Sequence, residues 1–162
     1  MNTIIKDAFD IKKDAANLKL AAKIIKSGGL VAFPTETVYG LGANALDIEA
    51  VKKIFVAKGR PQDNPLIVHV DSIEMMKPLV LSFDDRAKKL MEEFWPGPLT
   101  IIMKRSSLVP DIVSAGLDTV AIRMPSDEIA RELISLSNRP IAAPSANLSG
   151  SPSPSCAEHV IS

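Results

Sequence analysis

The chain has 162 residues, of which 46% are hydrophobic and 23% are charged, and 19 Lys and Arg residues balance 19 Asp and Glu residues. This length and composition predict one globular domain and exclude a disordered chain. A net charge of zero argues against a strongly basic nucleic-acid module, although it is compatible with a local basic patch. A single cysteine, Cys156, excludes an internal disulfide, and one Cys with two His residues cannot supply the four ligands of a structural zinc site.

Neither a targeting segment nor a membrane span stands out. The N-terminus lacks the apolar core of a signal peptide, and the longest run without charge, residues 140–157, is broken by prolines. We therefore expect a cytoplasmic protein that does not associate with membranes.

Helical and strand patterns alternate along the chain. Apolar residues spaced three and four apart, Asp caps and Gly or Pro stops indicate helices, whereas short runs that are apolar on both sides indicate buried strands. In chain order the pattern predicts a helix around 18–25, a strand at 30–33, a helix from 47 to 59, a strand at 66–70, a helix from 84 or 85 to 94, strands at 99–103 and 119–123, a helix at 127–136 and a strand at 140–143.

This alternation predicts an α/β fold in which helices cover the faces of an open sheet. The sheet is expected to be mixed, because a long connection with little helical pattern joins the strands at 99–103 and 119–123. Ligands of such sheets bind where loops leave the carboxyl ends of strands. The loops after Phe33, Val70, Arg123 and Ala143 are therefore the first candidates for a site.

The last residues have the pattern of a helix start. Ser155 and Glu158 fit a capping box, and Val160 and Ile161 begin an apolar face. The helix would be unfinished at Ser162, about two turns in, which is marginal for a helix. We therefore expect residues 1–162 to be one domain that is truncated at its C-terminal end, or a fragment of a longer protein.

A glycine pattern at residues 40–45 matches the dinucleotide-binding fingerprint with Ala in the last place. Six residues separate it from the preceding strand, so these glycines do not occupy a tight strand-to-helix turn. The pattern instead favours a tight bend packed against neighbouring backbone. A P-loop motif is absent.

Cationic and amide side chains gather in the stiff segment 58–65. Lys58 and Arg60 flank a glycine at a helix end, and Arg60 and Asn64 offer donors suited to phosphate oxygens. Basic residues also favour helix C-termini because of the helix dipole. From the residues alone, an anion site and a solvated helix end both remain open.

Three further candidates each have a structural alternative. His69 interrupts an apolar strand and is either a packed core histidine or a functional group. Arg123 ends a strand, where it suits a carboxylate or an edge salt bridge. The small polar residues at 144–147 suit an anion or an ordinary turn.

Taken in order, these segments closely resemble the YrdC-like threonylcarbamoyl-adenylate synthase family, from about Ala22 to the last residue. The motifs that carry the resemblance are FPTETVYGLG at 33–42, KGRP at 58–61 with NPL at 64–66, WPGPLT at 95–100, VAIRMP at 120–125 and APSAN at 143–147.

The resemblance implies a twisted open mixed sheet around a concave, positively lined cavity. It implies that the protein makes threonylcarbamoyl-AMP and pyrophosphate from L-threonine, bicarbonate and ATP, for the threonylcarbamoyladenosine modification of tRNA. Mg²⁺ is expected on the ATP phosphates, and the sequence shows no carboxylate cage for it. Downstream tRNA-modification proteins are expected partners, and some members of the family bind double-stranded RNA.

The resemblance also implies roles for particular residues. Lys58 and Arg60 are expected to grip the ATP phosphates and to carry catalysis. The other expected ATP contacts are Asn64, Thr119, Ser145, Asn147 and Ser153. The expected threonine contacts are Thr37, His69, Arg123 and the backbone at Ala143, and the sequence does not choose between Thr37 and the nearby Thr35.

Two rival functions differ in class. A non-catalytic module that binds double-stranded RNA or tRNA would use the same cavity, but a net charge of zero weighs against it. A carbamoyl-adenylate domain of a hydrogenase maturation protein would be accompanied by zinc-finger segments, which this sequence lacks. In the family the domain also continues with further strands and nucleotide contacts, including an Arg, which are missing here.

Overall fold

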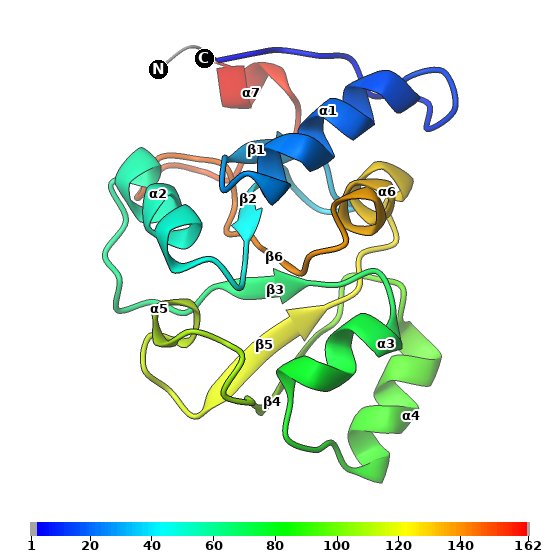
Figure 1. Cartoon of the computed structure of the whole chain (residues 1–162), viewed down its shortest axis with the longest axis vertical. Helices are drawn as coiled ribbons and strands as arrows, with labels where there is room; N and C mark the ends of the chain where they lie inside the picture. Colours follow the sequence, from blue (N-terminus) through cyan, green and yellow to red (C-terminus); the bar gives the residue numbers. More distant parts are fainter. Residues whose placement is uncertain (1–2, 162) are drawn as a thin grey trace.

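The computed structural model describes residues 3–161, and its strands in that range form one six-stranded sheet in the order β1-β2-β6-β3-β5-β4 (Figure 1). The strands are β1 (Val31–Phe33), β2 (Gly40–Asn44), β3 (Ile67–His69), β4 (Thr100–Lys104), β5 (Thr119–Arg123) and β6 (Ile141–Ala142). Strands β3 and β5 run parallel, and the other neighbouring pairs are antiparallel. The predicted mixed, open α/β sheet is confirmed.

Aspartate caps fix where the longer helices begin. Asp47, Asp84 and Asp127 each accept a hydrogen bond from a backbone N–H in the first turn of the helix that follows, which satisfies a donor that the helix itself leaves free. The helices are α1 (Ala15–Lys26), α2 (Ile48–Lys58), α3 (Ile73–Met76), the 3₁₀ turn η1 (Lys77–Leu79), α4 (Asp85–Phe94), α5 (Asp111–Ser114), α6 (Glu128–Ser137) and α7 (Glu158–Ile161). The four long helices were predicted, whereas α3, η1 and α5 are too short to show a helical period.

The end of the described chain differs in detail from the prediction. Helix α7 begins at Glu158, so the first helical residue lies later than a capping box at Ser155 would place it. Ser162 lies outside the described residues. Within residues 3–161, none of the helices has the length and apolar character needed to cross a membrane.

The sheet separates two apolar clusters, because successive residues of a strand point to opposite faces. On one face, Val68 and Ile122 pack with Ile54 of α2. On the other face, Ile141 packs with Ile25 of α1 and with residues of α6. Figure 1 shows α1 and α6 side by side over the strands β1, β2 and β6.

The face under α1 and α6 continues onto strands that these helices do not cover. His69 is paired with Ile141, so both side chains lie on this face, and Ile67 and Ala121 share it by the register of β3 and β5. Ile67 and Ala121 are partly exposed, and Ile102 of β4, paired with Ala121, is 69% exposed. We call this part of the sheet, formed by β3, β4 and β5, the open face. The concave cavity that the resemblance implies was not assigned to particular strands, and it stays a prediction.

The glycine-rich segment is a strand and not the tight bend that the sequence suggested. Residues 40–44 form β2, which pairs with β1 on one side and with β6 on the other. A Cβ atom on Gly42 would lie 2.6 Å from Cγ2 of Ile141 and 2.7 Å from Cε1 of Phe33. The close packing against neighbours was therefore predicted correctly, and the bend was wrong, because small residues here let Phe33 and Ile141 close over the strand.

Candidate functional site

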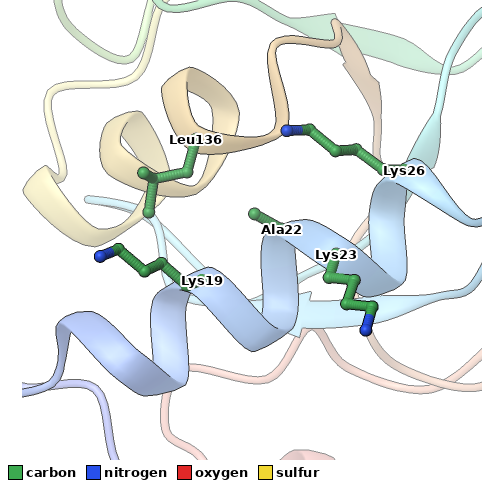
Figure 2. A pocket seen from close by; sticks show the side chains of 5 residues that line it. All are labelled: Lys19, Ala22, Lys23, Lys26 and Leu136. Atoms are coloured by element: carbon green, nitrogen blue, oxygen red, sulfur yellow. The ribbon is translucent and has the colours of Figure 1, made fainter.

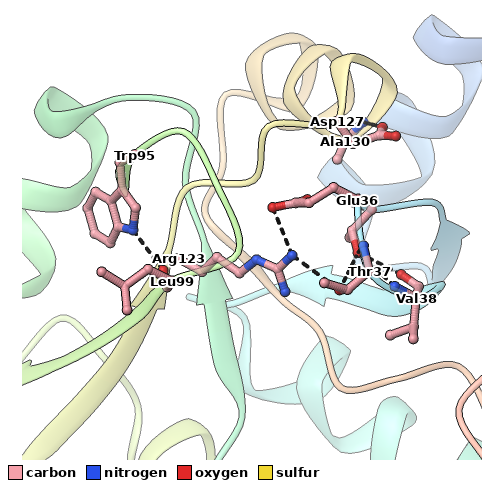
Figure 3. A network of polar contacts seen from close by, with 9 residues as sticks. Glu36, Thr37, Val38, Trp95, Leu99, Arg123, Asp127 and Ala130 are labelled. Carbon is pink, nitrogen blue, oxygen red and sulfur yellow. Dashed lines mark hydrogen bonds and ion pairs between the residues drawn. The ribbon is translucent and has the colours of Figure 1, made fainter. Parts of the chain in front are cut away.

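Arg123, the last residue of β5, holds together a polar network at one end of the open face (Figure 3). Its Nη2 lies 2.9 Å from Oε1 of Glu36 and donates a hydrogen bond of 3.2 Å to Oγ1 of Thr37. Both partners belong to residues 34–39, the loop between β1 and β2, which therefore reaches over to the end of β5. The Arg123 residue is only 8% exposed, so this ion pair is poorly screened by water.

The charge of Glu36 follows from this contact. Burial acts to raise the pKa of its carboxyl group, but the hydrogen bond and charge of Arg123, together with backbone N–H groups, outweigh burial and lower the pKa below its ordinary value. Glu36 is therefore ionised at neutral pH.

The geometry distinguishes the two candidate threonines. Oγ1 of Thr35 donates to the carbonyl oxygen of Val38 at 2.7 Å and accepts from the N–H groups of Thr37 and Val38, so it stabilises the loop from within. Thr37 instead directs its hydroxyl to Arg123. The arrangement favours Thr37 as the group that a ligand on Arg123 would meet.

His69 ends β3 and lies beside Arg123 in the parallel register of β3 and β5. The residue is 4% exposed, and its ring meets the Phe33 ring edge to face with centroids 6.1 Å apart. Burial, and then the positive charge of Arg123, lower the pKa of His69 to about 4. The imidazole is therefore neutral at neutral pH, and each of its nitrogens can take part in a hydrogen bond to an uncharged group.

Lys58, the last residue of α2, ties that helix to the loop after β6. Its ammonium group donates to the carbonyl oxygen of Ser145 at 2.5 Å and also to that of Asn147. In return, the N–H of Ser149 donates to the carbonyl oxygen of Lys58 at 3.0 Å. Lys58 is only 3% exposed, and burial, followed by the charge of Arg60, lowers its pKa.

Three other predicted ATP contacts, Ser145, Asn147 and Arg60, lie at or next to this junction. Oγ of Ser145 donates to Oδ1 of Asn147 at 2.5 Å, and Nδ2 of Asn147 donates to the carbonyl oxygens of Leu148 and Ser151. Arg60 follows Gly59, whose positive φ of 58° ends α2 and turns the chain.

Three predicted contacts stand further from these networks. Thr119 begins β5, four residues before Arg123 and on the open face, and is partly exposed. Asn64 and Ser153 are exposed loop residues. The backbone N–H of Ala143 donates to the carbonyl oxygen of Ile67 within the sheet, so this donor is already used.

Hydrogen bonds connect the two networks. The carbonyl oxygen of Tyr39, at the end of the loop that carries Thr37, accepts from the N–H of Ala146 at 2.8 Å, and Gly40 forms a β-bridge with Ser145. The structure thus joins the loop that carries Thr37 to the loop of Ser145 and Asn147.

Three buried nitrogen atoms point to a ligand in this region. Over residues 3–161, the buried side-chain polar atoms without a hydrogen-bond partner are Nε of Arg60, Nδ1 of His69 and Nε of Arg123. Such atoms are rare in folded proteins, because a buried donor without a partner is destabilising by about 1–3 kcal/mol. All three belong to residues that the sequence placed in the site.

Sequence reasoning missed two residues that build this region. Glu36 neutralises Arg123, and Tyr39 bonds through its backbone to Pro154 as well as to Ala146. An acidic residue three positions after the end of a strand was the available signal for Glu36. Nothing in the local pattern links Tyr39 to residues more than one hundred positions later.

A pocket elsewhere on the surface contains none of the predicted residues. It lies between α1 and α6 and is lined by Lys19, Ala22, Lys23, Lys26 and Leu136 (Figure 2). In the part of the chain that the structure describes, no group of three or more His, Cys, Asp or Glu side chains is placed to hold a metal ion.

Comparison with known proteins gives a consistent family. The family model for Sua5, YciO and YrdC proteins, described as telomere recombination, matches residues 23–162. Threonylcarbamoyl-AMP synthase from Pyrococcus abyssi is 60% identical over 143 residues, which is 88% of this chain and 42% of that protein. A putative threonylcarbamoyl-AMP synthase from Mycobacterium tuberculosis is 39% identical over 152 residues, or 94% of this chain and 70% of that protein.

Solved structures show the same fold. The crystal structure of Sua5 from P. abyssi in complex with L-threonine has a TM-score of 0.90 and 55% identity, and it covers 98% of this chain and 46% of that one. YciO from E. coli has a TM-score of 0.74 and 26% identity, with 84% and 66% of the two chains covered. This chain thus spans about two-fifths of the length of the synthase from P. abyssi. Its motifs, fold and sequence identity together show that it belongs to the Sua5/YciO/YrdC family.

Proposed function

We propose that the chain carries the site of an L-threonylcarbamoyladenylate synthase, which forms threonylcarbamoyl-AMP and pyrophosphate from L-threonine, bicarbonate and ATP. The observation that carries this proposal is the set of unpartnered buried nitrogens on Arg60, His69 and Arg123. In this proposal Arg60, with Lys58, forms the phosphate side and Arg123, with His69 and Thr37, forms the amino-acid side of one region, as a reaction between a nucleotide and an amino acid requires. The names of the P. abyssi and M. tuberculosis relatives support the same activity.

On the amino-acid side, Arg123 would hold the α-carboxylate of threonine, because a guanidinium group matches a carboxylate with two parallel hydrogen bonds. Thr37 and the neutral His69 would contact uncharged polar groups of the substrate. The threonine amine attacks the carbon of carbon dioxide derived from bicarbonate and loses a proton, which gives a carbamate. This side of the site needs to orient the amino acid and not to supply a nucleophile of its own.

On the nucleotide side, a carbamate oxygen attacks the α-phosphorus of ATP, and the bond from that phosphorus to the bridging oxygen breaks as pyrophosphate leaves. Charge on the phosphate oxygens then has to be stabilised by fixed donors. Arg60 has an unpartnered donor for this purpose. The ammonium group of Lys58 has three N–H donors. Two of them bind the carbonyl oxygens of Ser145 and Asn147 and hold that loop, and the third remains for a phosphate oxygen.

Mg²⁺ would arrive with ATP and be held by its phosphates and by water. The described residues offer no cluster of ligands for the ion, so no step is assigned to it. The product would serve the threonylcarbamoyladenosine modification of tRNA through downstream modification proteins, and we place this reaction in the cytoplasm.

The test is release of pyrophosphate from ATP by the purified chain, with threonine and bicarbonate supplied together, each omitted in turn, and both omitted. The proposal expects release only when both are present. Release that is independent of threonine, or threonine binding that is no stronger than binding of other amino acids, would contradict it. The variant Arg123→Met, which keeps part of the apolar stem and removes the guanidinium group, serves as the negative control, since it lacks the proposed carboxylate grip.

A further inference from the structure

We infer that Glu36 is a built-in competitor of the substrate, whose carboxylate occupies Arg123 in the empty site and must be displaced by the carboxylate of the incoming amino acid. The inference rests on the proposed function, because it takes the ligand of Arg123 to be an amino acid. It adds to that function a residue which sets how strongly, and with what selectivity, a carboxylate is bound.

The geometry of the guanidinium group limits how a carboxylate can bind Arg123. A carboxylate can grip this group with two bonds along the edge formed by Nε and Nη2 or along the edge formed by Nη1 and Nη2, because the third side is blocked by Cδ. Nη2 of Arg123 is common to both edges, and it is the atom that Glu36 and Thr37 occupy. Nε of Arg123 is buried without a partner. Nη2 carries two N–H groups and faces two resident acceptors, so a two-bond grip by a substrate requires at least one of Glu36 and Thr37 to release it. Of the two, the carboxylate is the group that an incoming carboxylate replaces like for like.

The Glu36 side chain can leave Arg123 without dismantling the site. The loop of residues 34–39 is stabilised by the hydroxyl group of Thr35 and by backbone bonds of Tyr39, and neither involves the Glu36 side chain. The backbone N–H of Ser126, just before α6, also contributes to lowering the pKa of the Glu36 carboxyl group. This favourable interaction with the ionised carboxylate does not depend on Arg123.

The ion pair between Glu36 and Arg123 also favours one class of ligand. Without Glu36, a site that holds no ligand would bury the charge of Arg123 without compensation, which is strongly destabilising. The ion pair with Glu36 removes this penalty. A neutral ligand cannot replace the lost ion pair, whereas a carboxylate can. Glu36 therefore favours ligands that carry a carboxylate and weakens the binding of each of them by the strength of its own contact.

Calorimetric titration of the variant Glu36→Gln tests the inference with two ligands, L-threonine and L-threoninamide. Glutamine keeps the shape and removes the charge. We expect threonine to bind about fivefold more tightly or better, since a charge-assisted contact gives way to a weaker neutral one. Threoninamide has no carboxylate, so its binding should not tighten. The matched control is Glu128→Gln, which removes the same charge from the exposed first turn of α6 and should leave threonine binding within twofold of the wild type.

The outcomes separate the inference from the proposed function. If wild-type protein and Glu36→Gln both fail to bind threonine, the proposed function and the inference are wrong together. If the wild type binds threonine and Glu36→Gln binds it equally or more weakly, only the inference is overturned, and Glu36 is a positioning residue for Arg123. An equal increase in the affinity for threonine and for threoninamide would also overturn the inference, because the effect would then come from the loop and not from competition between carboxylates. Should Glu36→Gln fail to fold, Glu36→Ala removes the same contact and must meet the same criteria.

Discussion

Replacing Lys58 by methionine is the sharpest test of how the phosphate side is built. Methionine keeps most of the apolar stem and removes the ammonium group, which leaves the carbonyl oxygens of Ser145 and Asn147 without their shared donor. Each such loss is worth about 1–3 kcal/mol when the group stays buried. Both loop residues are partly exposed, so water repairs part of the loss, and burial of the charge itself was unfavourable. We therefore expect a decrease of about 2 kcal/mol in the free energy of unfolding.

Urea unfolding measures this change, and a chain of this size should also lose about 4–8 °C in Tm. Lys53→Met is the matched control. Lys53 lies five residues before Lys58 on the same helix and donates to the carbonyl oxygen of Gly28 at 2.6 Å, but it is exposed and its hydrogen bond does not involve the loop of Ser145. Water can replace its ammonium group, so we expect a change of about 0.5 kcal/mol or less.

Threonine-dependent pyrophosphate release, measured on folded protein, completes the test. Loss of a preorganised charged donor should lower it by about a hundredfold in Lys58→Met and leave it unchanged in Lys53→Met. Equal stability of the two variants would refute the role of the carbonyl clamp. Lower stability with full activity would show that Lys58 only holds the loop and does not serve the phosphates.

Three further predictions concern other parts of the site. Arg123→Lys should raise the KM for threonine by about tenfold or more and leave the KM for ATP nearly unchanged, because lysine lacks the two-bond fork. Equal increases in the KM of both substrates would contradict this prediction. The pKa of His69 is about 4 in the folded chain and 6.5 for the free side chain. The free energy of unfolding should therefore fall by roughly 3 kcal/mol as the pH drops from about 7 towards 4, because the unfolded chain takes up the proton first. An NMR titration that placed the pKa of His69 near 6.5 would refute this prediction. Gly42→Ala should destabilise the chain by about 1–3 kcal/mol, since the new Cβ would overlap Phe33 and Ile141. An unchanged urea midpoint would contradict this, because it would show that these two side chains move aside at no cost.

What the sequence predicted is what local chemistry controls. Asp47, Asp84 and Asp127 cap helices through bonds to residues two or three positions later, so their signal is complete within a few residues. The short apolar runs were correctly predicted as strands for the same reason. Strand β2 was missed because a glycine-rich segment has little strand propensity of its own, and its partner in β6 lies about one hundred residues away.

The site shows the same division between local and distant information. The residues themselves were indicated by their motifs, but their contacts were not. Thr37 meets Arg123 across 86 positions, and Lys58 meets Ser145 across 87. Nothing in the local pattern showed that Lys58 would be occupied by carbonyl groups or that Glu36 would neutralise Arg123.

The balance of charge within the site explains how two different anions can be handled by one small region. No ion pair among residues 3–161 involves Lys58 or Arg60, so the phosphate side keeps its positive charge for a ligand with several negative charges. Arg123 is neutralised by Glu36, so the amino-acid side presents little net charge until a carboxylate replaces the resident one. On the proposed function, a polyphosphate would be drawn to the first side without displacing a protein group, whereas a single carboxylate would enter the second only by exchange. This difference would keep the phosphates of ATP from occupying the place of threonine, since the phosphate side would offer the stronger and uncontested attraction.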